Sequence, residues 1–235
     1  VLRGIECLKK HGVQYEILCV VHRENVFRAL EVYNYFKSLG ARHITFLPLV
    51  EKPVAGEQPG EGMSVPARAF GEFLVEIFDE WKTRDIGAVQ VQIFEEALRT
   101  AFGQDHTLCI FRKTCGGVPV VENNGDFYSC DHFVRKESLL GNIREQSLSS
   151  LLAHPRQRAF GRDKWKSLPK YCLECEVLDM CHGECPKNRF ISTPGGEPGL
   201  NYLCEGYRRF FNHIRPFARA VAELWRTEGG MKNNG

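Results

Sequence analysis

Residues 172–185 of this chain read Cys172-Leu173-Glu174-Cys175-Glu176-Val177-Leu178-Asp179-Met180-Cys181-His182-Gly183-Glu184-Cys185. The four cysteines follow the spacing Cys-x2-Cys-x5-Cys-x3-Cys, and Cys204 comes after them. Two thiolates separated by two residues converge on one metal or on one corner of a metal cluster, because the turn between them brings both sulfurs to the same side. The stretch therefore predicts a fold that is organised by metal ligation.

Three more cysteines precede this stretch, in the patterns Cys109-x5-Cys115 and Cys115-x9-Gly125-x4-Cys130. The chain has 10 cysteines, and all but two of them lie between Cys109 and Cys204, so sulfur is not spread through a general scaffold. The clustered cysteines make two sets of four. Each set suits one iron–sulfur cluster or one structural zinc, and the spacing by itself does not choose between these metals.

Disulfide bonds and unliganded core cysteines are the alternatives to metal ligation. A disulfide framework is typical of small secreted domains that lack a core, whereas this chain has 235 residues and shows no signal peptide. Its longest apolar runs, such as Ile17–Val21, are too short to span a bilayer. We therefore expect a soluble protein in the reducing cytoplasm.

Composition and charge are those of an ordinary globular protein. A length of 235 residues predicts one large domain or two modest ones. Hydrophobic residues at 43% and charged residues at 26% exclude a disordered, collagenous or coiled-coil chain. The net charge of +2 predicts neither a nucleic-acid partner nor a membrane partner.

The first hundred residues predict strands that alternate with helices. We expect helices over residues 1–10, 25–39 and 66–81, and strands over residues 15–21, 43–50 and 87–93. A loop rich in Gly and Pro at 51–64 follows the second strand, and loops in that position usually hold ligands in α/β barrels. The order predicts part of a parallel α/β barrel or of a doubly wound sheet.

The periodic pattern stops near Cys109, where Cys, Gly, Asn and Pro become frequent. Only two helices are expected beyond this point, one over 148–153 and one over 205–225 that is broken or kinked at Pro216. We therefore expect one domain over residues 1–105, a cysteine-rich domain with the terminal helix over 106–228, and a tail over 229–235.

The cysteine pattern as a whole resembles the SPASM domain of radical S-adenosylmethionine (SAM) enzymes, which carries two auxiliary [4Fe–4S] clusters. Cys109, the pair Cys130-Asp131 and the run Leu140-Gly141-Asn142-Ile143 resemble the anaerobic sulfatase-maturating enzymes within that group. Residues 1–105 are similar to the C-terminal part of the partial (β/α)6 radical SAM barrel.

The Cys-x3-Cys-x2-Cys motif, which holds the SAM-cleaving cluster in this family, is not in the chain. We therefore expect a fragment that does not perform radical chemistry alone. A helix that begins at residue 1 points the same way, and N-terminal processing of an intact protein is the alternative.

The resemblance implies two interleaved ligand sets. The first auxiliary cluster would be held by Cys109, Cys115, Cys130 and Cys185, and the second by Cys172, Cys175, Cys181 and Cys204. SAM and a third [4Fe–4S] cluster are implied for the full-length enzyme. The implied partners are a sulfatase polypeptide and an electron donor such as flavodoxin or ferredoxin. We expect the remaining cysteines, Cys7 and Cys19, to be small buried hydrophobic residues.

The resemblance also implies oxidation of a Cys or Ser side chain of a sulfatase to Cα-formylglycine. Asp131 corresponds to the family's base, which would take the proton of the substrate thiol or hydroxyl. The alternative role for Asp131 is to cap turn N–H groups beside a cluster. His132, in an extended stretch, would point away from Asp131.

Two other functions are compatible with the same cysteines. One is another SPASM-type peptide modification, such as thioether cross-linking or maturation of a peptide-derived cofactor. The other, of a different class, is a non-catalytic zinc-binding interaction module.

Two further features lie close to the cysteines. A basic stretch contains Arg156, Arg158, Arg162, Lys164, Lys166 and Lys170. We expect it to form a solvated face, with docking of an acidic partner as the alternative. His182 and Gly183 are expected to shape the turn before Cys185 and not to bind metal.

Overall fold

The computed structural model describes residues 1–53, 56 and 58–232, and the chain divides into two compact units. The first unit comprises Val1–Gln104 and Leu203–Gly235, and the second comprises Asp105–Tyr202. The units meet in the sequence near residue 105, where the periodic pattern stops. The terminal helix lies in the first unit, whereas the sequence pattern grouped it with the cysteines.

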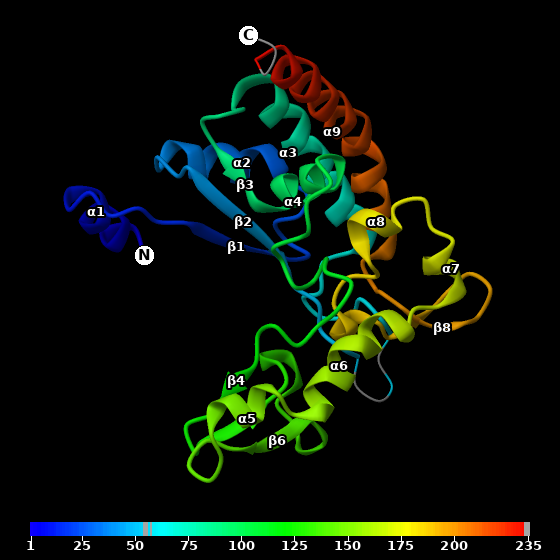
Figure 1. Ribbon diagram of the computed structural model, residues 1–235. Coiled ribbons are helices and arrows are strands. Elements are labelled where there is room, and N and C mark those ends of the chain that lie inside the picture. Colours follow the sequence, from blue (N-terminus) through cyan, green and yellow to red (C-terminus); the bar gives the residue numbers. More distant parts are fainter. Residues whose placement is uncertain (54–55, 57, 233–235) are drawn as a thin grey trace. The chain divides into compact units, whose positions relative to one another are not determined.

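The first unit contains a parallel three-stranded sheet in the order β1-β2-β3 (Figure 1). Its strands are β1 (Ile17–Val21), β2 (His43–Pro48) and β3 (Gln90–Val91). Ile17 pairs with Ile44, and His43 pairs with Gln90. Three consecutive residues of β2 are buried, as expected for a parallel strand that is covered on both faces. The predicted parallel α/β arrangement is confirmed for these three strands.

Helix α1 (Leu2–Lys10) precedes β1, and helices α2 (Ala29–Ser38), α3 (Ala67–Arg84) and α4 (Gln92–Ala101) follow β1, β2 and β3 in turn. Helix α2 begins later than predicted because Asn25 does not cap it. Asn25 Oδ1 instead accepts the N–H of His22 at 2.8 Å, in a turn that precedes the helix.

Helix α4 replaces most of the predicted third strand. The alternation of apolar residues over 87–93 favours a strand, yet only Gln90 and Val91 are in β3. From Gln92 onward the backbone is helical, and this places Phe94 and Ala97 on one buried face. The alternating pattern was too short to distinguish a strand from the start of a helix.

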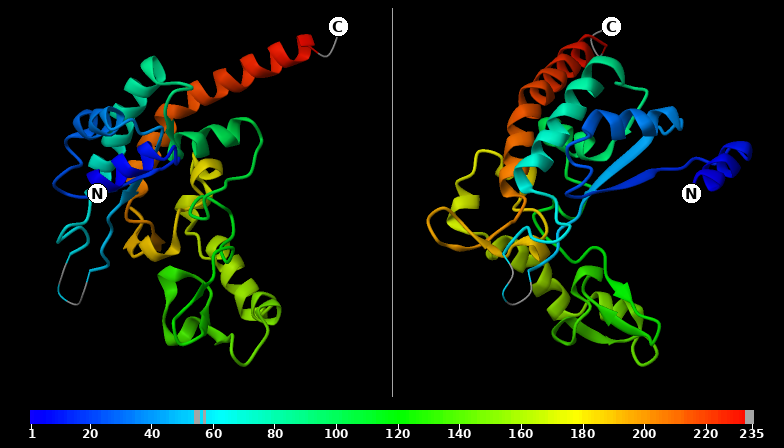
Figure 2. Two further views of the ribbon diagram at one scale, coloured as in Figure 1. Left: turned by 90° about the vertical axis from the view of Figure 1, so that its left-hand side faces the viewer. Right: turned by 180° about the vertical axis from the view of Figure 1, so that it is seen from behind.

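Helix α9 (Cys204–Lys232) packs along α3 and α4, and Figure 2 shows it beside α3. The helix continues through Pro216, so the expected break does not occur. Phe78 is the centre of an aromatic cluster on α3, α4 and α9. Its ring lies 5.4–6.5 Å, between centroids, from Trp81, Phe94, Phe210, His213 and Phe217.

The backbones of α3 and α9 are in direct contact where Gly71 meets Gly206. A Cβ atom on Gly206 would lie 2.1 Å from the carbonyl oxygen of Ala67, and one on Gly71 would lie 2.5 Å from the carbonyl oxygen of Gly206. No side chain fits between these backbones. The aromatic cluster therefore depends on two glycines that contribute nothing to it themselves.

The second unit has little regular structure. Antiparallel strands β4 (Val120–Val121), β5 (Asp126–Tyr128) and β6 (Leu139–Asn142) pack against α5 (Leu148–Leu152) through Phe127, Leu140 and Leu151. The other elements are η1 (Asp131–Phe133), η2 (Lys136–Ser138), α6 (Pro155–Lys166), α7 (Lys170–Leu173), α8 (Leu178–Cys181), η3 (Pro186–Asn188), β7 (Ile191–Ser192) and β8 (Pro198–Leu200). Other buried apolar residues of this unit include Phe111, Leu168, Val177, Met180 and Leu200.

Several sequence expectations outside the cysteine-rich unit have clear outcomes. Cys19 is buried in β1, and burial raises the pKa of its thiol to about 11. Cys7 is exposed, so its prediction as a buried residue is wrong: α1 buries only Ile5 and turns Cys7 outward. The expected tail is helical as far as Lys232, and residues 233–235 lie outside the described part of the chain.

The loop expected over 51–64 leaves the carboxyl end of β2, and its residues 54, 55 and 57 also lie outside the described part. Among the described helices, none is long and apolar enough to cross a bilayer.

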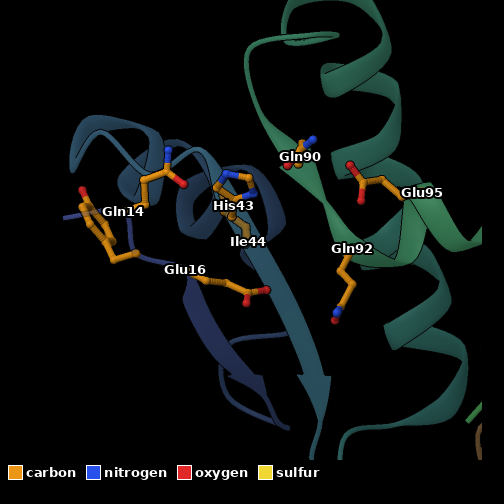
Figure 3. Close-up of a pocket in the computed structure, with 8 residues that line it drawn as sticks. Gln14, Glu16, His43, Ile44, Gln90, Gln92 and Glu95 are labelled. Atoms are coloured by element: carbon orange, nitrogen blue, oxygen red, sulfur yellow. The ribbon is translucent and has the colours of Figure 1, made fainter. Parts of the chain in front are cut away.

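A cavity of about 380 Å³ lies at the amino ends of β2 and β3, away from the end where that loop leaves the sheet. It is lined by Gln14, Tyr15, Glu16, His43, Ile44, Gln90, Gln92 and Glu95. Figure 3 shows Glu16 extending from the segment before β1, and Gln92 and Glu95 from α4. Burial raises the pKa of Glu95, and the nearby His43 partly offsets this effect.

We expect Gly206→Ala to destabilise the first unit, because its methyl group would overlap the carbonyl oxygen of Ala67. Overpacking of this kind costs about 1–3 kcal/mol, so the midpoint of urea unfolding, followed by circular dichroism, should fall. Gly4→Ala is the matched control. A Cβ there meets nothing within 4 Å, and alanine is favoured over glycine in a helix. A wild-type midpoint for Gly206→Ala would contradict the close approach of the helices.

Candidate metal centre

The stretch from Cys172 to Cys185 folds into two short helices followed by a left-handed turn. Cys172 lies in α7, and its carbonyl oxygen accepts the N–H of Cys175 at 3.1 Å. Cys181 ends α8. The three residues that follow, His182, Gly183 and Glu184, have φ angles of 46°, 71° and 50°. The chain therefore reverses sharply between Cys181 and Cys185.

The side chain of Arg189 holds this left-handed turn. Its guanidinium donates hydrogen bonds to the carbonyl oxygens of His182 at 3.1 Å, Gly183 at 2.9 Å and Glu184 at 3.1 Å. A left-handed conformation costs about 1–2 kcal/mol for each residue that is not glycine. Hydrogen bonds to a charged group contribute about 1.5–3 kcal/mol each. The three bonds are therefore sufficient to keep the turn in place.

Gly183 is required inside this turn. A Cβ atom at this position would lie 2.2 Å from Leu168 Cδ2 and 2.8 Å from Arg189 Nη2. The structure agrees with the expectation that His182 and Gly183 shape the turn. The imidazole of His182 points elsewhere, and its Nδ1 lies 2.7 Å from the carbonyl oxygen of Phe111.

The cysteines of the predicted first set lie in the same region of the second unit, but among the described residues no three of their sulfurs lie within 4.8 Å of one another. Cys115 interacts electrostatically with Cys109 and Cys185, and Cys109 interacts in the same way with Cys130. His132 lies between two of them: its Nδ1 is 4.0 Å from Cys130 Sγ and 4.0 Å from Cys185 Sγ. The turn at residues 182–184 therefore returns Cys185 to cysteines that lie far upstream in the sequence.

Burial raises the pKa of these thiols. The pKa of Cys130 and that of Cys185 are raised to about 12, and the pKa of Cys115 is also raised. Neighbouring cysteines add to the effect, because each thiolate disfavours the next. A bound metal has the opposite effect and deprotonates a coordinating thiol. All ten cysteines are free thiols in the structure.

The cysteines of the predicted second set come from both units. Cys172 and Cys175 interact electrostatically, and burial raises the pKa of Cys172. Arg189 interacts with Cys172 and Cys181. Cys204 is the first residue of α9 and belongs to the first unit. The assignment of individual ligands to two sets stays a prediction.

Asp131 follows Cys130 directly, in the short helix η1. Its Oδ1 accepts hydrogen bonds from the backbone N–H of His132 at 3.0 Å and from the thiol of Cys130 at 3.2 Å. The Asp131 side chain is nevertheless 60% exposed. One carboxylate thus stabilises the turn beside a cysteine and remains open to solvent, where a substrate can reach it.

The prediction for the orientation of His132 is wrong. Its Nδ1 lies 3.6 Å from Asp131 Oδ1, so the two side chains point toward each other. The reason is that residues 131–133 form a 3₁₀ turn and not an extended segment, and only an extended segment places successive side chains on opposite sides. Cys130, Asp131 and His132 place one ligand atom each within 4.8 Å of one another.

Helix α6 supports the backbone beside the first set. Its buried residues Gln157, Gly161 and Lys164 recur at helical spacing and face inward. Gln157 Nε2 donates to the carbonyl oxygens of Gly116 and Ser129, and the carbonyl oxygen of Gly161 accepts the N–H of Cys115 at 3.0 Å. Lys164 donates to the carbonyl oxygens of Cys109 and Ile110.

Lys164 was expected on a solvated face, and this prediction is wrong because the residue is only 1% exposed. Of the rest of the basic stretch, Arg156, Arg158, Arg162, Lys166 and Lys170 are exposed as expected. The helical spacing of Lys164 from Gln157 and Gly161 is the sequence signal that could have indicated its burial. The prediction of a solvent-exposed Lys164 rested only on its charge.

Comparison with known proteins agrees with the cysteine pattern. Residues 109–176 match the SPASM family, described as an iron-sulfur cluster-binding domain. A serine-type anaerobic sulfatase-maturating enzyme of Bacteroides thetaiotaomicron is 43% identical over 231 residues, which cover 92% of this chain and 56% of that protein. A cysteine-type enzyme of Clostridium perfringens is 28% identical over 216 residues, which cover 91% of this chain and 58% of that protein. The chain thus spans a little more than half the length of these relatives.

A solved structure described as "Native anSMEcpe with bound AdoMet and Cp18Cys peptide" has a TM-score of 0.82 at 28% identity. The match covers 94% of this chain and 61% of that one. These comparisons show that residues 109–176 match an iron-sulfur cluster-binding domain, as the cysteine spacing indicated, and that the chain is similar in sequence and in its mixed α/β fold to anaerobic sulfatase-maturating enzymes.

We expect Arg189→Lys to disrupt the turn before Cys185. Lysine keeps the charge, but its three donors lie on one atom and do not match the fork that bonds three carbonyl oxygens. An unpaired buried carbonyl costs about 1–3 kcal/mol. Iron content after anaerobic reconstitution and the thermal midpoint should both fall. Arg162→Lys, an exposed change on α6, is the control. If Arg189→Lys retains the wild-type values, Arg189 does not hold the turn.

Proposed function

We propose that this chain, which carries a SPASM domain and is similar to anaerobic sulfatase-maturating enzymes, forms the C-terminal portion of a radical SAM oxidoreductase. The reaction is oxidation of a Ser or Cys side chain of a sulfatase to Cα-formylglycine. The observation that carries this proposal is the group formed by Cys109, Cys115, Cys130 and Cys185 beside the exposed carboxylate of Asp131. The higher identity to the serine-type relative supports serine as the side chain that is oxidised.

Two auxiliary [4Fe–4S] clusters are proposed, with four ligands each. The first is held by Cys109, Cys115, Cys130 and Cys185, and the second by Cys172, Cys175, Cys181 and Cys204. The chemistry that such a cluster supplies when bound is to take up an electron from the oxidised side chain. The protein contributes the thiolate ligands, the turn that positions Cys185 and the support of α6.

Residues 1–105 are proposed to be the C-terminal part of a (β/α)6 barrel, and residues 106–228 an auxiliary-cluster domain with the terminal helix. The parallel order β1-β2-β3 with intervening helices supports the barrel. SAM and a third [4Fe–4S] cluster would be bound by the complete enzyme. A sulfatase polypeptide is the proposed substrate, and flavodoxin or ferredoxin is the proposed electron donor. We place the protein in the cytoplasm, where thiols stay reduced.

Asp131 is the proposed base. Its carboxylate is exposed on one side and fixed on the other by the N–H of His132, so it accepts a proton without losing its orientation. A base in this position takes the proton of the substrate hydroxyl or thiol while the Cβ centre is oxidised. The same hydrogen bonds place it directly beside the ligand Cys130.

Asp131→Asn is expected to keep SAM cleavage but to lower formylglycine formation at least about 100-fold, the usual contribution of a general base. The assay uses the enzyme together with its SAM-cleaving segment and peptides that carry Ser or Cys at the modified position, with products measured by mass spectrometry. Glu137→Gln, an exposed change on η2, is the control. Unchanged product yield would remove Asp131 from the mechanism. A thioether product would favour another SPASM-type modification.

The cofactor assignment predicts a brown protein. The anaerobically reconstituted chain should absorb light at about 400 nm. It should contain about eight iron atoms per chain, the number in two [4Fe–4S] clusters. Mass spectrometry measures the metal content, and the absorbance spectrum shows whether a cluster is present. Colourless protein with about two zincs per chain would instead support the zinc-binding module.

A further inference from the structure

A buried lysine lies beside the first cysteine set, and the proposed reaction does not use it. Lys164 is 1% exposed, and its Nζ donates to the carbonyl oxygen of Cys109 at 2.8 Å and of Ile110 at 2.6 Å. A buried ammonium group is strongly unfavourable unless it is both hydrogen-bonded and balanced by an anion. The two carbonyls satisfy two of its three donors but carry no net charge.

The buried charges of the second unit do not balance without the cysteines. Arg189 is a second, partly buried cation that interacts electrostatically with Lys164. Across residues 105–202, all of which the structure describes, Glu184 is the only buried carboxylate, with 3% exposure. Its Oε2 accepts hydrogen bonds from the side-chain amides of Asn188 and Asn201. Lys164 and Arg189 therefore share one buried carboxylate, which also interacts with Lys187.

Cysteine sulfurs that bind a cluster as thiolates would supply the missing negative charge. Lys164 interacts electrostatically with Cys115 and Cys185, which both belong to the proposed first set. An ammonium group in this place is stabilised when the sulfurs are thiolates that bind a cluster.

We propose that Lys164 is a positioning residue of the first auxiliary cluster, which fixes the backbone at Cys109–Ile110 and makes this cluster easier to reduce. The inference rests on the proposed cluster ligation. Four thiolates give a bound cluster a net negative charge, and reduction, in which [4Fe–4S]²⁺ takes one electron to become [4Fe–4S]⁺, adds another. A buried cation nearby stabilises the reduced form.

The effect should concern one of the two clusters. Lys164 is tied by its hydrogen bonds and electrostatic interactions to Cys109, Cys115 and Cys185 of the first set. Arg189, in contrast, interacts with Cys172 and Cys181 as well as with Cys115, so its charge is shared between the sets. A change at Lys164 alone therefore alters the charge beside the first set.

The test is a redox titration of the reconstituted chain with dithionite, followed by electron paramagnetic resonance. Lys164→Gln keeps an amide donor but removes the charge, whereas Lys164→Arg keeps the charge. Lys166→Gln, an exposed change on the same helix, is the matched control. In Lys164→Gln, we expect the reduction equilibrium of one cluster to become about tenfold less favourable, which is about 59 mV more negative for a one-electron couple. Lys164→Arg and Lys166→Gln should remain close to the wild type.

The possible results distinguish the role of Lys164 from the proposed cluster ligation. Unchanged potentials in Lys164→Gln, with the full iron content, overturn the inference and leave the cluster ligation intact. Loss of iron from Lys164→Gln but not from Lys164→Arg supports the positioning role of the charge. Loss of iron from both variants overturns the role proposed for the charge. A wild-type chain that binds zinc and no iron overturns the proposed function itself.

Discussion

The arrangement of the cysteine-rich unit depends on one arginine side chain. Its guanidinium group donates hydrogen bonds to three consecutive backbone carbonyl oxygens. Arg189 stabilises the left-handed turn at residues 182–184, and this turn separates Cys181 from Cys185. Because the chain reverses there, Cys185 reaches cysteines that are more than fifty residues upstream. Two cysteines that are close in sequence can thus serve different ligand sets. The interleaved ligation implied by the family needs this separation.

Charge, more than apolar burial, characterises the surroundings of the cysteines. The second unit buries a lysine and a carboxylate and partly buries an arginine beside thiols whose pKa values are raised. Thiols in such a place are poor free nucleophiles at neutral pH, but they become good ligands once a metal displaces their protons. A metal or cluster bound by these thiols would add to the stability that the apolar residues around Phe127 provide. Folding and cofactor binding should therefore be coupled.

The sequence was sufficient to predict those helices and strands whose own residues show a clear pattern of apolar positions. The parallel strands β1 and β2 could be predicted because each is a short apolar run, and the helix α3 because its apolar residues recur at helical spacing. Helix α4 could not, since its first residues continue the alternation of a strand. The inward position of Lys164 was also missed, because its burial depends on carbonyl groups that approach from a distant part of the chain.

The sequence by itself indicated metal ligation by two sets of cysteines and a resemblance to SPASM proteins, because the number and spacing of cysteines limit which metal sites can form and residues 109–176 match the SPASM family. Only the tertiary structure decided which cysteines are neighbours, that His132 lies between Cys130 and Cys185, and that Lys164 is buried. The physical reason is that these contacts join segments distant in sequence through left-handed turns and a helix face. The spacing of residues predicts where a turn forms, but it does not predict which distant residues contact that turn in the folded chain.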